Sequence, residues 1–236
     1  MDGSANIKDT GGPHACIIRD PSFYVDRTEQ QSYCPVCENW QPDFHDFNGR
    51  KKARCIHCGS LERHRSVWIY FKEKTDLFKK VDRTFLHIAP EACFVDKFSC
   101  FFKSGYLTSD LNMARAMIKM NIMNIPYPND SFEIIYSSHV LEHVEKYVQA
   151  LQELYRVLVP SGWMILLIPT RAEDKTFRFA QKSQVGHIWK FGCDFIEILE
   201  KIGFNVKRWT IAELFTPSLI KSMRLKKKQE IFHCFK

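Results

Sequence analysis

The sequence predicts an α/β protein, with a mostly parallel sheet flanked by helices and a small cysteine-rich module before it. Two observations support this prediction. From residue 84 onward, short apolar strands alternate with amphipathic helices, which is the rhythm of a parallel sheet. Before residue 60, two close cysteine pairs stand at the spacing of a metal-binding ribbon. A chain of 236 residues has room for one α/β domain and such an appendage.

Four strands of the sheet can be placed from their apolar runs. They are Thr84–Ile88, Tyr106–Ser109, Phe132–Ser137 and Trp163–Ile168. A helix of about 14 residues should join the last two strands and stop at Pro160-Ser161-Gly162. Its apolar stripe would consist of Val144, Val148, Leu151, Leu154 and Leu158.

Three further elements are predicted around this core. A helix should follow the second cysteine pair, with Ser60 as its cap and with Leu61, Trp68 and Phe71 on its buried face. Asp194–Ile202 should form another helix, in which Asp194 and Glu197 make a capping-box-like pair. Phe204–Trp209 and Ile231–Phe235 then read as a final hairpin.

Composition and charge are those of an ordinary soluble globular chain, with 45% hydrophobic and 26% charged residues. The longest apolar run, Trp163–Ile168, is too short to span a bilayer, and the first residues lack the order of a secretory signal. The net charge of +7 gathers in residues 50–54, 63–65 and 221–228. Such stretches can contact nucleic acid, although a solvated basic surface is the simpler explanation.

Four of the nine cysteines form two Cys-x-x-Cys pairs separated by 17 residues. Two such turns can close a tetrahedron of thiolates around one soft ion, which predicts a structural zinc site with ligands Cys34, Cys37, Cys55 and Cys58. Free or disulfide-paired cysteines, an iron–sulfur centre, and His57 as a substitute ligand are the alternatives. The other five cysteines are scattered, which favours a reducing cytoplasm over a disulfide framework.

The stretch from residue 121 to 169 resembles the middle of a class I S-adenosylmethionine-dependent methyltransferase. The similar segments are Asn-Ile-Met-Asn-Ile-Pro-Tyr-Pro, Ser-Ser-His-Val-Leu-Glu-His and Pro-Ser-Gly-Trp-Met-Ile-Leu-Leu-Ile-Pro. The segment Cys-x-x-Cys-Gly-Ser-Leu-Glu-Arg-His-Arg resembles the head of a bacterial, type 11-like group that carries an N-terminal zinc ribbon. The resemblance implies a Rossmann-like sheet of seven mostly parallel strands with a partly antiparallel final hairpin, and S-adenosylmethionine and zinc as cofactors.

The resemblance also implies a domain layout. Residues 1–30 would be a flexible arm, 31–60 the zinc ribbon, 61–83 a linking helix and 84–236 the methyltransferase domain. In the linking helix, Glu62, Arg63, His64 and Arg65 would cover the mouth of the active site. The alternative for these four residues is a helix surface with ordinary salt bridges.

Open parallel sheets bind ligands at the carboxyl ends of their strands, so three loops should hold the cofactor. Asp110, followed by Leu111, ends the second strand, where a carboxylate can accept hydrogen bonds from both ribose hydroxyls; a capping or surface role is the alternative. The resemblance puts Asn121 beside the adenine amino group and Ile122 against the ring, although Asn121 also suits a turn. Ser138 and His139 would then lie near the sulfonium.

The first loop departs from the family pattern of an acidic residue followed by Gly-x-Gly. In Leu-His-Ile-Ala-Pro-Glu, His87 takes the acidic position, Ala89 replaces the first glycine, and Pro90 lacks a backbone donor. The ribbon-bearing group has a similar version of this loop. Glu91 is therefore an alternative contact for the methionine ammonium group, and a fold without activity is an alternative for the whole chain.

Methyl transfer to a hydroxyl or an amine needs a base beside the acceptor. The histidine pair His139 and His143 supplies candidates, although His143 also suits a structural role at the end of the strand. His187 is a second candidate, in a loop that faces the acceptor in the similar group. Glu173-Asp174 would contact substrate or form a solvated acidic turn. A metal site at His-x-x-x-His is set aside because the metalloprotease glutamate is missing.

These observations favour a cytoplasmic enzyme that methylates a small molecule, a sugar or a peptide, with no membrane partner. An RNA methyltransferase is the alternative. It is weakened because the chain lacks an Asn-Pro-Pro-Tyr type tetrapeptide, and because few aromatic residues interleave the basic loop of the ribbon. A zinc-dependent binding module with an inactive methyltransferase fold is the third hypothesis.

Overall fold

The computed structural model describes residues 31–170, 175–183 and 186–236, so the predicted arm and Glu173-Asp174 lie outside the described residues. Within these ranges, no helix combines the length and the apolar character needed to cross a membrane. The elements, in chain order, are β1 Ser32–Cys34, β2 Asn39–Gln41, β3 His45–Phe47, β4 Arg50–Arg54, α1 Glu62–Lys74, η2 Leu77–Lys79, β5 Phe85–Ile88, α2 Ala92–Phe102, η3 Lys103–Gly105, β6 Tyr106–Asp110, η4 Met113–Arg115, β7 Ile118–Lys119, β8 Phe132–Ser138, η5 Leu141–His143, α3 Tyr147–Val157, β9 Leu158–Leu167, β10 Phe177–Arg178, β11 Trp189–Lys190, α4 Phe195–Ile202, β12 Asn205–Thr210, α5 Ile211–Leu214, α6 Pro217–Ser222 and β13 Glu230–Phe235.

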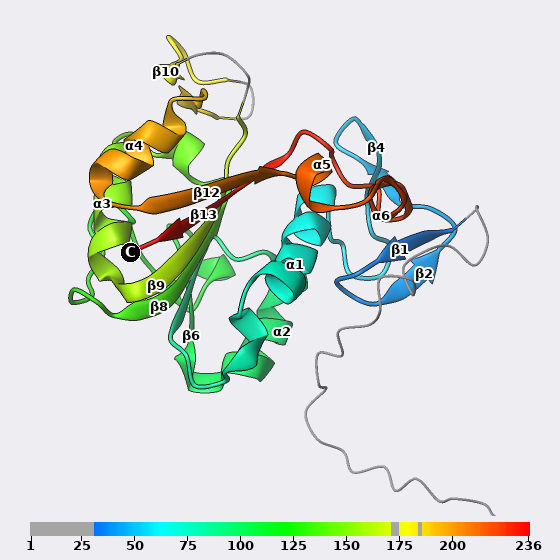
Figure 1. Cartoon of the computed structure of the whole chain (residues 1–236), viewed down its shortest axis with the longest axis horizontal. Helices are drawn as coiled ribbons and strands as arrows, with labels where there is room; N and C mark the ends of the chain where they lie inside the picture. Colours follow the sequence, from blue (N-terminus) through cyan, green and yellow to red (C-terminus); the bar gives the residue numbers. More distant parts are fainter. Residues whose placement is uncertain (1–30, 171–174, 184–185) are drawn as a thin grey trace, which may run out of the picture.

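Seven strands form one sheet in the order β12-β13-β9-β8-β5-β6-β7. The five strands from β9 to β7 are mutually parallel. β13 enters antiparallel beside β9, and β12 pairs antiparallel with β13 at the edge. The predicted Rossmann-like sheet with an antiparallel final hairpin is therefore confirmed, and Figure 1 shows how its strands fan out between the helices.

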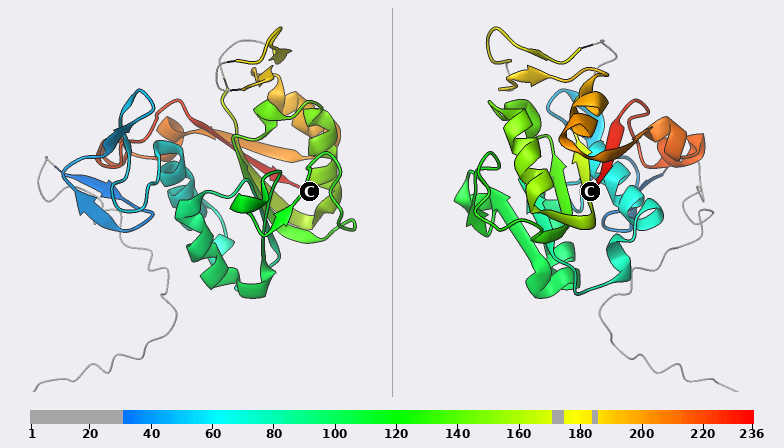
Figure 2. Two further views of the ribbon diagram at one scale, coloured as in Figure 1. Left: turned by 180° about the vertical axis from the view of Figure 1, so that it is seen from behind. Right: turned by 60° about the vertical axis from the view of Figure 1, so that its left-hand side comes forward.

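Successive side chains along a strand point to opposite faces of the sheet, so they pack into two separate hydrophobic cores. Along β8, Ile134 and Tyr136 join the core beneath α1 and α2, whereas Ile135 joins the core beneath α3 and α4. Leu61, Trp68 and Phe71 are buried as predicted. The two views of Figure 2 show these helix pairs on opposite faces of the sheet.

Two small hairpins, β1–β2 and β3–β4, form the ribbon. In Figure 1 it lies at the end of the molecule beside α1 and α6, far from the C-terminus. Arg224, just after α6, binds Asp43 of the ribbon with Nη2–Oδ2 2.9 Å and Nε–Oδ1 3.1 Å. The segment after α6 therefore holds the ribbon against the rest of the protein.

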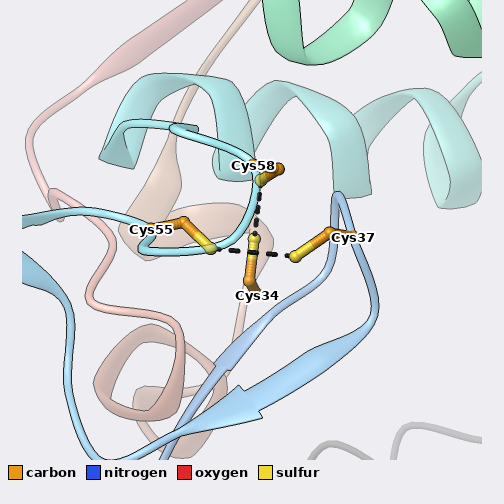
Figure 3. Close-up of side chains that lie close together, drawn as sticks. All are labelled: Cys34, Cys37, Cys55 and Cys58. Atoms are coloured by element: carbon orange, nitrogen blue, oxygen red, sulfur yellow. Dashed lines mark hydrogen bonds between the residues drawn. The ribbon is translucent and has the colours of Figure 1, made fainter.

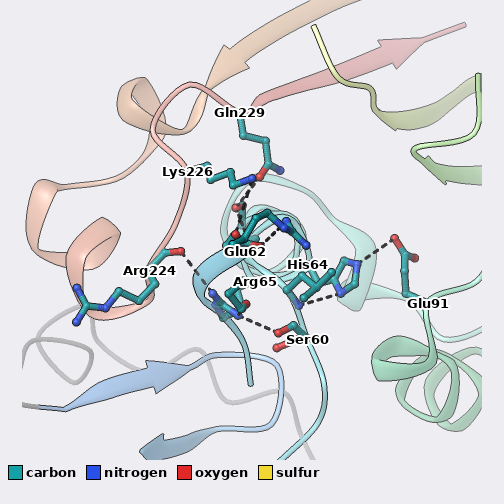
Figure 4. A network of polar contacts seen from close by, with 12 residues as sticks. Ser60, Glu62, His64, Arg65, Glu91, Arg224, Lys226 and Gln229 are labelled. Atoms are coloured by element: carbon teal, nitrogen blue, oxygen red, sulfur yellow. Dashed lines mark hydrogen bonds and ion pairs between the residues drawn. The ribbon is translucent and has the colours of Figure 1, made fainter. Parts of the chain in front are cut away.

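Arg65 on α1 is fully buried where the ribbon, α1 and the C-terminal segment meet. Its guanidinium donates hydrogen bonds to the carbonyl oxygens of Ala53 (3.0 Å) and Met223 (2.8 Å). It also donates to the carbonyl oxygen of Ser60 (2.9 Å), as Figure 4 shows. It also lies 3.7 Å above the ring centroid of Phe44. Arg65 belongs neither to a basic surface patch nor to the mouth of an active site, and both expectations for it were wrong.

Helix caps differ from the predictions because the capping side chains have other partners. Ser60 does not cap α1; its hydroxyl lies 3.1 Å from Cys34 Sγ, and the Leu61 N–H donates instead to His64 Nδ1 (3.1 Å). Asp194 makes no capping bond in α4, because its carboxylate accepts hydrogen bonds from the backbone and hydroxyl of Thr176, both at 2.7 Å.

The helix before β9 is shorter than predicted. α3 ends at Val157, and the Pro-Ser-Gly segment lies inside β9, where the pairing with β8 shifts between Phe132 and Ile134. This irregularity accommodates the proline that cannot continue a regular ladder. Val148, expected on the apolar stripe, is 40% exposed because the stripe is carried by Tyr147, Ala150, Leu151, Leu154 and Val157.

His233 on β13 is a buried histidine of the first core. Its Nδ1 lies 3.0 Å from Tyr70 Oη, and its ring stacks 4.1 Å from that of Phe235. Burial, reinforced by Lys207, lowers the pKa of His233 to about 3. A folded-state pKa below the unfolded value of about 6.5 gives stability that is complete above pH 6.5 and is lost as the pH falls.

His233→Gln should therefore flatten the acid limb of stability. Below pH 6.5, the wild-type free energy of unfolding should fall relative to the variant by up to about 1.4 kcal/mol per pH unit, because unfolding takes up one more proton. Urea unfolding at pH 7, 6 and 5 measures this difference, and His45→Gln on the exposed β3 is the control. Parallel stability curves for wild type and His233→Gln would contradict it.

Candidate functional site

Four cysteines of the ribbon meet at one point, as predicted. Their sulfur atoms lie within 4.8 Å of one another, with Cys34–Cys58 at 3.6 Å and Cys37–Cys55 at 3.7 Å (Figure 3). A tetrahedral zinc ion with Zn–S bonds of about 2.3 Å holds its sulfurs roughly 3.8 Å apart, so these thiols fit zinc. These four cysteines form no disulfide, and His57 is exposed and outside the cluster.

The residues directly after β5 and β8 share a left-handed backbone. Ala89 has φ +51° and His139 has φ +56°. Ala89 thus adopts the conformation that glycine usually supplies, and its N–H donates to the Ser109 carbonyl at 2.7 Å. Backbone strain of this kind at two neighbouring strand ends is typical of ligand sites.

A buried polar network fills the first loop. His87 Nε2 lies 2.7 Å from Glu91 Oε2 and His87 Nδ1 2.7 Å from Tyr106 Oη, while Tyr136 Oη donates to Glu91 Oε1 at 3.1 Å. Burial opposes the charge of Glu91, but the hydrogen bonds and charge interactions around it, of which the His87 hydrogen bond is the largest, together lower the pKa of Glu91 to about 2. Glu91 is therefore a fixed anion, while His87 is completely buried within the network.

Of the four residues expected over the active site, His64 lies closest to this loop. Its Nε2 lies 3.8 Å from Glu91 Oε1 and has no hydrogen-bond partner among the described residues (Figure 4). Burial lowers the pKa of His64 to about 3, so the ring is neutral at pH 7. Glu62 is turned away and pairs with Arg50 at 2.9 Å and Lys226 at 3.8 Å.

The residues expected at the cofactor ribose and adenine gather around the ends of β6 and β7. Asp110 Oδ1 accepts the Asn112 N–H at 2.8 Å, and Asn121 Oδ1 accepts the Met123 N–H at 3.0 Å. Both oxygens therefore stabilise turns. The Asp110 carboxylate and the Asn121 amide can each still form further hydrogen bonds. Ile122 is buried in the core, whereas Leu111 is 66% exposed beside Asp110.

Buried hydroxyl groups at the strand ends are also consistent with a bound cofactor. Ser109 Oγ is buried at the end of β6 and has no hydrogen-bond partner within the described ranges. Buried polar groups normally have a partner, so this hydroxyl points to a missing one. Ser138, at the end of β8, lies on the other side of β5 and is buried as well.

The three histidines predicted as candidate bases do come together. His139 Nδ1 lies 3.0 Å from Glu142 Oε1, and His187 Nε2 lies 3.9 Å from the same oxygen. The rings of His143 and His187 meet edge-to-face at 4.9 Å. Glu142 is fully buried on η5, so one carboxylate lies beside His139 and His187, and His143 packs against His187.

A cavity of about 450 Å³ lies next to this histidine cluster. It is lined by Glu145, Arg178, Phe179, Ala180, Lys182 and Ile188. The Ile188 N–H donates to the Glu142 carbonyl at 2.7 Å, which joins the cavity wall to the cluster. The cavity therefore has a size and a place suited to a small acceptor.

Sequence reasoning missed Tyr106 and Tyr136, and it noted Glu142 beside the histidine pair without giving it a role. Tyr136 lies opposite His87 in the parallel ladder, so the strand register carries this signal once the pairing is known. Glu142 stands between two candidate histidines in the sequence, and its spacing of three from His139 fits the turn of η5.

Comparisons with known proteins support a methyltransferase-like fold. A family model described as a methyltransferase domain matches residues 104–166, which run from η3 through most of β9. Curated relatives named demethylmenaquinone methyltransferase match short segments: the one from Lysinibacillus sphaericus is 32% identical over 62 residues, and the one from Listeria welshimeri 41% over 46. These matches cover 26% and 20% of this chain, and the chain spans about a quarter or less of those relatives.

Solved structures share the fold over most of the chain. An S-adenosylmethionine-dependent methyltransferase from Mesorhizobium loti has a TM-score of 0.53 at 13% identity, covering 72% of this chain and 98% of its own. The [4+2]-cyclase SpnF has a TM-score of 0.54 at 12% identity, covering 82% and 86%. The chain thus has the fold of the class I S-adenosylmethionine-dependent methyltransferases.

Cys55→Ser should remove a metal ion and destabilise the protein, because one thiolate of the closed cluster is lost and the ribbon is tied to α1. Elemental analysis of chelator-free protein should give at least one zinc per wild-type chain and about one fewer in the variant. The melting temperature should fall far more for Cys55→Ser than for Cys100→Ser, which changes an exposed thiol on α2. Equal metal content in the two variants would refute the site.

Proposed function

We propose that this chain is an S-adenosylmethionine-dependent methyltransferase acting on a small-molecule, sugar or peptide acceptor, with a structural zinc ribbon beside its active site. The observation that carries the proposal is the convergence of Ala89, Asp110 and His139 at the carboxyl ends of three adjacent parallel strands. Ligands of open α/β sheets bind at this edge. The matched methyltransferase domain, residues 104–166, contains Asp110 and His139.

S-adenosylmethionine would supply a methyl group on a sulfonium, which is a good leaving group. Asp110 would orient the ribose hydroxyls, and the exposed Leu111 would cover one side of the adenine, with Asn121 at its edge. The fixed anion Glu91, together with the Ala89 backbone, would hold the methionine ammonium group. His87 would act indirectly, by keeping Glu91 charged and oriented through its 2.7 Å hydrogen bond.

His139 is the proposed base. With Nδ1 donating to Glu142, its Nε2 keeps a lone pair for the acceptor proton, and the carboxylate stabilises the imidazolium that forms. The acceptor electron pair forms the new bond to the methyl carbon, the carbon–sulfur pair stays on sulfur, and the acceptor proton passes to His139. His143 and His187 line the same end of the site.

An RNA acceptor is a weaker proposal because much of the basic charge is already used inside the protein. Arg65 is buried, Arg50 pairs with Glu62, Lys52 with Asp43 at 2.6 Å, and Arg224 with Asp43. The free thiols of the ribbon suit a reducing compartment such as the cytoplasm. A binding module without turnover has the same fold and is separated from the enzyme by the experiments below.

Asp110→Ala should weaken S-adenosylmethionine binding by roughly 2–3 kcal/mol, because a charged acceptor for two hydroxyls is lost. Isothermal titration calorimetry measures this change, with Asp96→Ala on the exposed side of α2 as the matched control. An unchanged dissociation constant for Asp110→Ala would overturn the placement of the cofactor. No binding by the wild type would overturn the proposed function.

His139→Ala should lower the turnover rate by about 10² or more and leave cofactor affinity nearly intact, since only the base is removed. Product formation is followed as S-adenosylhomocysteine released in the presence of candidate acceptors. If the wild-type protein binds S-adenosylmethionine but forms no product with any of the acceptors, the result would favour a binding module with an inactive methyltransferase fold. Full activity of the variant would exclude His139 as base and indicate an acceptor that is already ionised.

A further inference from the structure

We infer that Glu142, His143 and His187 form a second metal site, which binds a divalent transition-metal ion separately from the ribbon. One ligand atom from each of these side chains lies within 4.8 Å of the others. Two imidazoles and one carboxylate are a ligand set that suits zinc and its neighbours cobalt and nickel. The binding of the ion stands on this geometry alone, whereas its role below rests on the proposed function.

The Glu142 carboxylate is the strongest reason to place a cation here. Its side chain is fully buried, and Oε1 accepts one hydrogen bond from His139. Oε2 is buried and has no hydrogen-bond partner within the described residues. A buried carboxylate has up to four acceptor sites and is costly to leave with so little compensation. A cation between Glu142 and the two other histidines would supply the missing charge.

Both histidine ligands are held by contacts that prepare them for a metal. His143 Nδ1 lies 3.1 Å from the Gly186 carbonyl, and donation to this oxygen leaves Nε2 with its lone pair. Metal-binding histidines commonly use their second nitrogen in this way. Gly186 has φ +81°, a conformation that glycine accommodates, and this turn brings His187 next to His143.

The present distances are slightly wider than a zinc site requires. Tetrahedral ligands at 2.0–2.1 Å from zinc lie about 3.4 Å apart, whereas Glu142 Oε1 and His187 Nε2 are 3.9 Å apart. His143 is exposed and the His187 side chain is 24% exposed, so both rings have room to rotate inward. Three protein ligands leave a fourth position open, as in catalytic zinc sites.

The open coordination position indicates which class of acceptor the ion would bind. An ion held here would adjoin His139 and the 450 Å³ cavity, and it would bind the oxygen of an alcohol or a phenol rather than a carbon nucleophile. Coordination lowers the pKa of a bound hydroxyl, which makes its proton easier for His139 to remove. The proposed enzyme would then be a metal-assisted O-methyltransferase.

Equilibrium dialysis against micromolar zinc, followed by elemental analysis, tests the site without any acceptor or cofactor. Wild-type protein should hold two zinc ions per chain, and His143→Ala, His187→Ala and their double variant should hold one. Calorimetric zinc affinity for the second ion should fall at least tenfold in each single variant. His45→Ala, an exposed histidine outside the cluster, is the matched control and should hold two.

A wild-type stoichiometry of one zinc, or two zinc ions retained by the double variant, would overturn the inference. Acetohydroxamate, a bidentate oxygen chelator, should shift the visible spectrum of the second cobalt ion in a cobalt-loaded sample, and no shift would overturn the open position. S-adenosylmethionine binding is measured separately on the same samples. If the wild-type protein does not bind S-adenosylmethionine, the proposed function would be overturned, whereas the metal site would stand.

Discussion

The buried guanidinium of Arg65 is the interaction on which the arrangement of the whole molecule depends. Its three short hydrogen bonds end on backbone carbonyls of the ribbon, of the turn before α1 and of the segment after α6. The Ser60 oxygen also accepts the Cys55 N–H at 2.9 Å, but loss of the buried guanidinium would take one donor from each of the three carbonyls, which is costly. The ribbon, α1 and the segment after α6 are therefore tied together at this one side chain. The ribbon holds α1 in position, and α1 carries His64 to the first loop.

Under the proposed function, that connection would explain how a loop without the usual glycines holds the cofactor. Ala89 takes up the left-handed conformation at the end of β5. The conformation is supported by a rigid polar network beneath it, in which His87 bridges Tyr106 and Glu91. Glu91 keeps its charge at neutral pH, and the neutral His64 faces it from α1. In the proposed enzyme, Glu91 at the start of α2 would carry the acidic function that was expected at the end of the strand, four residues earlier. The fold alone does not specify methyl transfer, as the likeness to a [4+2]-cyclase shows.

The sequence was sufficient for the parallel sheet and the four-cysteine cluster, because period and spacing report these directly. The antiparallel direction of the final hairpin came from the family resemblance instead. It was insufficient where one side chain had to choose between partners. Ser60 and Asp194 have the residue types of caps, but tertiary contacts with Cys34 and Thr176 take their place. Arg65 stands in a basic stretch of the sequence that is typical of a surface patch. Only the fold reveals the backbone carbonyls that surround its guanidinium. His187 could be connected with His143 only by the turn at Gly186, which brings together residues 44 positions apart.

A crystal structure of the complex with S-adenosylhomocysteine tests the central claim most directly. The account predicts the ribose hydroxyls on the Asp110 carboxylate, the adenine beside Leu111, the amino acid end near Ala89 and Glu91, and the sulfur directed toward His139. The ribbon should keep its contact with α1 through Arg65. A ligand bound away from the ends of β5, β6 and β8, or no binding at millimolar concentration, would contradict the account.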